Sequence, residues 1–248
     1  MALSDLTYIE IIEGLFALIT LTITVSIGIG IIYKFKKSNN NKLVPIGIFW
    51  ALMGSPWVSA SITFIMYIFV DFGLSPIMYI CIAASPYPLA VMIWIRSYGI
   101  LTELRFRKPL FYIYCIISGI FYALLFSFLF SGDPELISLI GVLEGKFNIH
   151  FGIVVLTIGS FGFLSVCFTG VHFSLRSMKI NDKVIKWKSR FLLLAFILYT
   201  VGVLSDSIVP TIFTFFTALF RALVILSGIL FYLAFFYRKR LTEITVKA

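Results

Sequence analysis

Long apolar stretches, each about as long as a bilayer is thick, alternate along the chain with short segments rich in Lys and Arg. A membrane-spanning helix needs about 20 mostly apolar residues. Seven stretches reach that length, and they cover residues 8–33, 44–70, 75–101, 109–130, 149–175, 190–209 and 211–236. The pattern predicts an all-α fold, in which residues 1–248 form one bundle of seven transmembrane helices.

The sixth and seventh stretches are separated by a single short interruption. Ser205, Asp206 and Ser207 precede Pro210, and this polar set followed by proline favours a tight turn. One continuous helix through both stretches is the competing interpretation. The turn would bring the two helices side by side.

Composition agrees with a membrane protein and argues against most other classes. The chain is 60% hydrophobic and 12% charged, whereas soluble domains carry about 25% charged residues. His150 and His172 stand at opposite ends of the predicted fifth helix, so they cannot share a metal ion. The sequence has no CxxC, HExxH or GxSxG pattern. We therefore expect no enzyme activity, no catalytic residues, no cofactor and no metal site.

The basic residues predict how the chain is threaded through the membrane. Of the 20 Lys and Arg residues, 17 lie between the first and second, third and fourth, and fifth and sixth stretches, or after the seventh. Basic loops face the cytoplasm, which places the N-terminus outside and the C-terminus in the cytoplasm of a multi-pass protein of the cell membrane. Attraction of this side to anionic headgroups of the lipid bilayer accounts for the net charge of +9 without a nucleic-acid partner.

The largest outer loop and two proline motifs predict features inside the bundle. In the loop, "LISLIGVL" either lies on the membrane surface or folds into the mouth of the bundle. The motifs "GSPW" and "SPYP" should kink the second and third helices and free backbone carbonyls, which either line a cavity or are met by side chains such as Ser55 or Ser85. We expect a central cavity lined by Trp57 and Tyr87, with Tyr98 as a further candidate. Bent packing without a cavity is the alternative.

Arg221 is the one charge within the apolar run "FFTALFRALVILSGILFYLAFF". An arginine near the centre of a membrane helix costs about 2.5–3.5 kcal/mol on insertion scales. It should therefore turn into the bundle toward a partner, and Asp206 is the first candidate, with Glu13 as the second. The set Arg221, Asp206 and Glu13 is either a structural ion pair or a ligand-binding site, and snorkelling of Arg221 is a third interpretation.

A second charged pair lies near the predicted cytoplasmic end of the third helix. Arg96 lies about one and a half turns above that end, and Glu103 follows seven residues later. Snorkelling explains Arg96. The functional alternative is a cytoplasmic switch formed by Arg96 and Glu103.

The chain resembles known membrane proteins in two ways. Seven helices with an outer N-terminus are the topology of rhodopsins and G-protein-coupled receptors, but the seventh helix has no lysine for a retinal Schiff base, and the DRY and NPxxY motifs are absent. The segments "PLAVMIWIRSYGILTELRFRK" and "RALVILSGILFYLAFFY" look like a group of uncharacterised archaeal seven-helix integral membrane proteins. That resemblance covers residues 13–237, and it implies seven helices in an archaeal-type membrane without implying an activity.

Three functions fit these observations. In the first, a receptor- or sensor-like bundle binds a small ligand from the outer side and signals to a separate cytoplasmic protein partner at the basic loops. In the second, the protein is a transporter or channel for a small anionic solute that Arg221 attracts. In the third, it is a structural subunit of a membrane complex.

Overall fold

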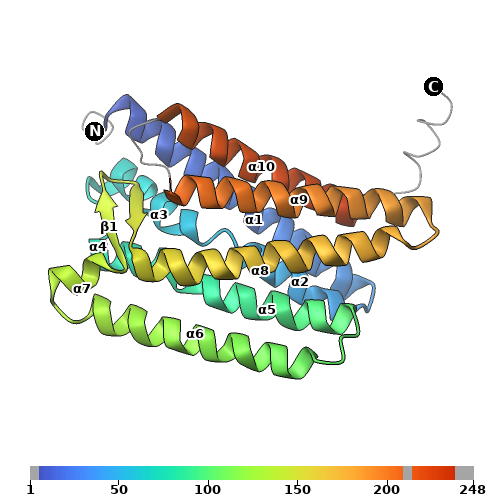
Figure 1. The fold of residues 1–248 in the computed structure, drawn as a ribbon. Coiled ribbons are helices and arrows are strands. Elements are labelled where there is room, and N and C mark those ends of the chain that lie inside the picture. Colours follow the sequence, from blue (N-terminus) through green and yellow to red (C-terminus); the bar gives the residue numbers. More distant parts are fainter. Residues whose placement is uncertain (1–5, 209–213, 238–248) are drawn as a thin grey trace.

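The computed structural model describes residues 6–208 and 214–237, and most of them are helical (Figure 1). A two-stranded hairpin, β1 and β2, interrupts the helices between α7 and α8. The elements are α1 Tyr8–Lys37, η2 Asn41–Leu43, α2 Val44–Leu52, α3 Pro56–Val70, α4 Pro76–Ala84, α5 Pro86–Leu101, α6 Arg107–Leu129, α7 Pro134–Ser138, β1 Gly141–Glu144, β2 Asn148–Phe151, α8 Ile153–Met178, α9 Lys183–Ile208 and α10 Thr214–Phe236.

Six helical segments of the described chain are long and apolar enough to cross a membrane, and α4 with α5 counts as one of them. The pair α2 and α3 passes the same test but is bent by 52°, so the number rises to seven if this pair is one span. The chain is therefore a multi-pass membrane protein with an α-helical bundle. The exact number of spans and the side on which each terminus lies stay predictions.

The two ends of the bundle differ in structure (Figure 1). The hairpin and α7 lie at one end, which we call the hairpin end, and the α5–α6 and α8–α9 connections lie at the other, which we call the basic end. Helices α9 and α10 pack extensively side by side, as the turn interpretation requires. Pro210 itself lies outside the described residues.

The loop between α6 and α8 folds into the mouth of the bundle. Strands β1 and β2 pair antiparallel, with Gly141 opposite Phe151. Phe147 is buried, and the Tyr79 hydroxyl donates a hydrogen bond to its carbonyl over 2.7 Å. The predicted helix start at residue 149 is wrong, because residues 149–151 belong to β2. The chain turns at Gly152, where a Cβ atom would collide with the backbone of Leu139.

Proline breaks divide the second and third predicted spans, as their motifs indicate. The Trp57 N–H bonds to the Gly54 carbonyl, which frees the Met53 carbonyl, and the Tyr199 hydroxyl donates to that carbonyl over 2.6 Å. At the second break the Tyr122 hydroxyl donates to the Ser85 carbonyl over 2.7 Å. The expectation that serine side chains meet these carbonyls is wrong. Tyrosines from neighbouring helices reach them instead.

Removing the Tyr199 hydroxyl should destabilise the fold. Tyr199→Phe leaves the buried Met53 carbonyl without a donor, and an unsatisfied buried acceptor costs about 1–3 kcal/mol. Thermal unfolding in detergent measures the loss. Tyr232→Phe is the matched control, because Tyr232 is 45% exposed on α10 and should change the free energy of unfolding by less than about 0.5 kcal/mol. Equal losses in the two variants would contradict the role of Tyr199 at the helix break.

A layer of large aromatic side chains fills the bundle toward the basic end. Trp50 stacks on Phe231 with ring centroids 3.9 Å apart, and Trp94 lies 4.8 Å from Phe196 and 5.0 Å from Phe49. All five side chains are fully buried. We call these five residues the aromatic layer. Stacked and tilted rings at such distances stabilise a core beyond the area they bury.

Candidate functional site

Arg221 lies in α10 near the hairpin end, and its side chain is only 6% exposed. Its Nη2 donates a hydrogen bond to Asn148 Oδ1 over 2.8 Å, and its Nη1 donates to the Glu13 carbonyl over 3.3 Å. Its Nε lies 3.6 Å from Asp206 Oδ1. One guanidinium thus joins α1, β2, α9 and α10, which offsets the cost of burying its charge.

The structure brings together the three charged residues that the sequence singled out. Asp206 stands beside Arg221 on α9, and Glu13 reaches the group from α1 through its backbone carbonyl. The Glu13 side chain is itself only 7% exposed, and its carboxylate lies close enough to Asn148 to interact with it. Of the two carboxylates, only that of Asp206 forms an ion pair with the guanidinium. We call Glu13, Asn148, Asp206 and Arg221 the charged cluster.

Asn148 is the member of the charged cluster that sequence reasoning missed. It begins β2 and is buried by the folding of the hairpin into the bundle. An asparagine in a polar loop is ordinary, so its sequence position carried no signal. The one available hint was the alternative in which the loop enters the mouth of the bundle.

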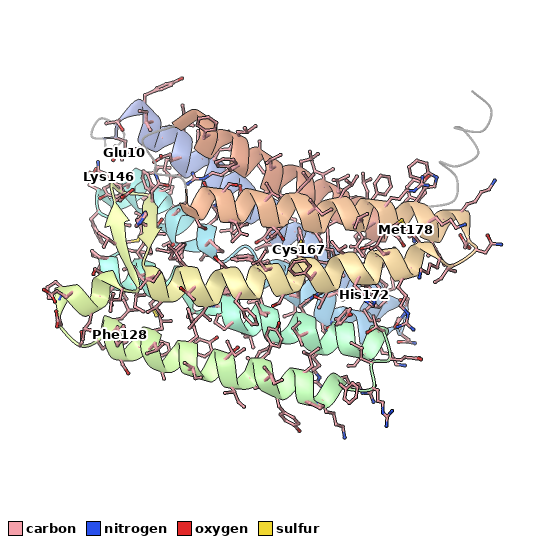
Figure 2. All side chains as sticks on the ribbon, in the orientation of Figure 1. Glu10, Phe128, Lys146, Cys167, His172 and Met178 are labelled. Atoms are coloured by element: carbon pink, nitrogen blue, oxygen red, sulfur yellow. The ribbon has the colours of Figure 1, made fainter. Side chains whose placement is uncertain are left out.

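A second ion pair lies closer to the rim of the same end. Lys146 Nζ is 3.8 Å from a Glu10 carboxylate oxygen, and Figure 2 shows both residues at the hairpin end, with Met178 at the opposite one. Lys146 also lies over the Tyr67 ring, 5.1 Å from its centroid. These contacts fasten the turn of the hairpin to α1 and α3, above the charged cluster.

A small polar cavity adjoins the charged cluster. Its volume is about 50 Å³, and its lining includes Trp57, Tyr79, Asn148, Asp206 and Arg221. The Arg221 Nε is itself buried and has no hydrogen-bond partner among the described residues. One buried water needs about 10–15 Å³, so the cavity is large enough for water.

The predicted single cavity is wrong, because Trp57 and Tyr87 line different cavities. Tyr87 faces an apolar cavity of about 40 Å³ among α4, α6, α8 and α9, and its hydroxyl donates to the Gly159 carbonyl over 2.7 Å. The two spaces adjoin, because both are lined by Pro56, Phe151, Val203 and Ser207. Tyr98 lines neither; its hydroxyl lies 2.8 Å from His172 Nδ1 near the basic end.

The proposed switch residues Arg96 and Glu103 do not come together. Both side chains are exposed, and no ion pair or hydrogen bond joins them in the described part of the chain. Glu103 follows the end of α5 with a φ of 53°, which turns the chain away from the helix axis. At this end it is Arg176 that connects two segments, donating from Nη1 to the Thr102 carbonyl over 2.6 Å.

The comparisons with known proteins give no family. The chain matches no protein-family model, no curated protein and no solved structure. Within residues 6–208 and 214–237, no group of three or more His, Cys, Asp or Glu side chains is placed to hold a metal ion.

Proposed function

We propose that this membrane protein is a receptor- or sensor-like bundle that binds a small ligand at Glu13, Asp206 and Arg221. The observation that carries the proposal is a polar cavity within the apolar bundle that Asp206 and Arg221 line, with the buried Glu13 in contact with Arg221 through its backbone carbonyl. Ionisable residues inside membrane spans are expensive, and a functional role is the default interpretation. The charge bias along the sequence assigns the hairpin end, and with it the site, to the outside.

The aromatic layer supports a site that is reached from one end only. Phe231 follows Arg221 by ten residues on α10, and Phe196 precedes Asp206 by ten residues on α9. Both spacings correspond to about 15 Å along a helix. Five large rings thus close the bundle between the charged cluster and the basic end. Binding without passage through the bundle is the behaviour of a sensor.

Helix α9 offers a route from the site to a partner. It carries Asp206 near one end and begins at Lys183 in a basic segment at the other. In that segment Arg190 lies over the exposed Trp187 ring, 5.0 Å from its centroid. A shift of α9 caused by ligand binding would move this basic surface, where a separate cytoplasmic protein or the anionic membrane surface would detect it.

A transporter is the second candidate, and the broken helices favour it. The 52° bend between α2 and α3 lies next to the polar cavity, which Pro56 lines. Discontinuous helices near the bilayer midplane form the substrate sites of many secondary transporters. The two candidates differ in whether the cavity is reached from one side of the membrane or from both.

Labelling of a single cysteine separates the two candidates. Cys81, Cys115 and Cys167 are replaced with Ala, and Ser207→Cys is introduced because Ser207 lines both cavities. A membrane-impermeant thiol reagent is then added to right-side-out and to inverted vesicles. A sensor predicts reaction from the hairpin end only. Reaction from both sides would establish the transporter, and reaction from neither would contradict an accessible site.

Two further cysteines serve as controls for the vesicles. Ser131→Cys lies on the exposed connection after α6 at the hairpin end, and Ser177→Cys lies near the end of α8 at the basic end. Ser131→Cys should react only in right-side-out vesicles and Ser177→Cys only in inverted ones. The opposite result would reverse the orientation that the basic loops predict.

A further inference from the structure

We propose that the ligand of this site is a proton, which the Glu13 carboxylate takes up from solution at the hairpin end. The inference rests on the function proposed above, because it names the ligand of the same site. It follows from the charges, the contacts and the size of the site.

The charged cluster contains one more acidic than basic side chain. Glu13, Asp206 and Arg221 carry one net negative charge when all are ionised, and Glu13 and Arg221 are nearly inaccessible. The other groups that face Glu13 do not supply the balance. Glu10 adds a carboxylate and is paired with Lys146, and Tyr79 is neutral. An uncompensated buried charge is costly, and protonation removes it.

The contacts assign the proton to Glu13 rather than to Asp206. The Asp206 carboxylate lies 3.6 Å from the guanidinium Nε, and a neighbouring positive charge favours the ionised form of a carboxylate. The guanidinium donates to Glu13 only at its backbone carbonyl. Its side chain lies instead beside the neutral amide of Asn148. The Glu13 carboxylate therefore has less positive charge beside it than the Asp206 carboxylate has.

The cavity that Asp206 and Arg221 line is small, and Glu13 adjoins this site through its contact with Arg221 rather than by lining the cavity. Pockets for small organic molecules occupy about 300–1,000 Å³, whereas this one measures about 50 Å³. Water in it would lie beside Asp206 and Arg221, which line it. The step is balanced: an O–H bond of a hydronium ion breaks, an O–H bond forms on the Glu13 carboxylate, and a neutral water is left.

Protonation would change how α1 holds the hairpin. An ionised Glu13 carboxylate only accepts hydrogen bonds, whereas the protonated group also donates one. Its neighbour Asn148 belongs to β2 and accepts from Arg221 through Oδ1. A proton on Glu13 therefore alters the contacts of Asn148, and through them the link between the hairpin and α10. This gives the sensor a defined change at its site.

Infrared difference spectroscopy tests the assignment directly. The wild-type protein at neutral pH should show the C=O band of a protonated buried carboxyl, and the band should vanish as the pH is raised. Glu13→Gln should remove it, and the exposed control Glu135→Gln should leave it unchanged. If Glu13→Gln does not fold, Glu13→Asp serves instead, because it should shift the band. A spectrum without this band at neutral pH, or a band insensitive to Glu13, would overturn the proposal.

Thermal unfolding with salts at constant ionic strength covers the other ligand classes. Sodium, methylammonium and acetate should each leave the melting temperature of the wild type within error of the buffer alone. A saturable rise with sodium or methylammonium would identify a cation site, and one with acetate an anion site. Either result would contradict a proton as the ligand, but it would not contradict a site that is reached from one side of the membrane. Reaction of Ser207→Cys from both membrane sides would instead overturn the sensor and leave the proton intact.

Discussion

Arg221→Leu should lower the free energy of unfolding by about 3–5 kcal/mol, the loss expected when one partner of a buried ion pair is removed. The substitution leaves the Asp206 carboxylate in an apolar bundle without the positive charge that pairs with it. It also takes the donors from Asn148 Oδ1 and from the Glu13 carbonyl. Thermal unfolding of the purified protein in detergent measures the change.

The matched control for this variant is Arg96→Leu. Arg96 is the other arginine within a predicted span, but its side chain is exposed and makes no ion pair among the described residues. Its loss should change stability by less than about 0.5 kcal/mol. The double variant Asp206→Leu with Arg221→Leu should be more stable than Arg221→Leu alone, because it also removes the carboxylate that Arg221→Leu leaves unpaired. Equal losses for Arg221→Leu and Arg96→Leu would show that the charged cluster does not hold the bundle together.

Much of the bundle could be predicted from the sequence because bilayer thickness fixes the length of an apolar span. The breaks at Pro56 and Pro86 could be predicted too, since proline removes a backbone donor. The groups that meet the freed carbonyls could not. Tyr199 is 146 positions from Met53 in the chain, and hydropathy carries no information about which helices become neighbours. For the same reason the hairpin strand at 149–151 appeared to continue a helix.

The candidate site divides in a similar way. Arg221, Asp206 and Glu13 attract attention because charges are rare in apolar segments. Asn148 has no such signal, since its importance comes from the folding of a polar loop into the bundle. Proline positions predict where a helix bends, but the walls of a cavity depend on packing around the bend. Trp57 and Tyr87 therefore seemed to share one cavity that the structure divides in two.

Trp50→Ala is expected to have the second large effect. It should lower the stability of the fold and open the site to reagents from the basic end. Truncating a buried tryptophan costs about 3–5 kcal/mol, because the lost contacts leave a cavity. Trp50 is fully buried, stacks on Phe231 at 3.9 Å and lies 5.4 Å from the Tyr199 ring. Its removal opens the aromatic layer next to the tyrosine that meets the broken helix. Thermal unfolding measures the first effect.

The second effect is on access through the bundle. It shows whether Trp50 blocks a path from the basic end or only packs the core. In the cysteine-labelling assay, Trp50→Ala should let the Ser207→Cys thiol react from the basic end as well as from the hairpin end. Trp187→Ala is the control, because this tryptophan is 42% exposed at the start of α9 and lies outside the aromatic layer. Trp50→Phe keeps a ring in place and should preserve one-sided labelling. If Trp50→Ala is destabilised but still reacts from one end only, the ring packs the core without closing it, and another part of the bundle must separate the charged cluster from the basic end.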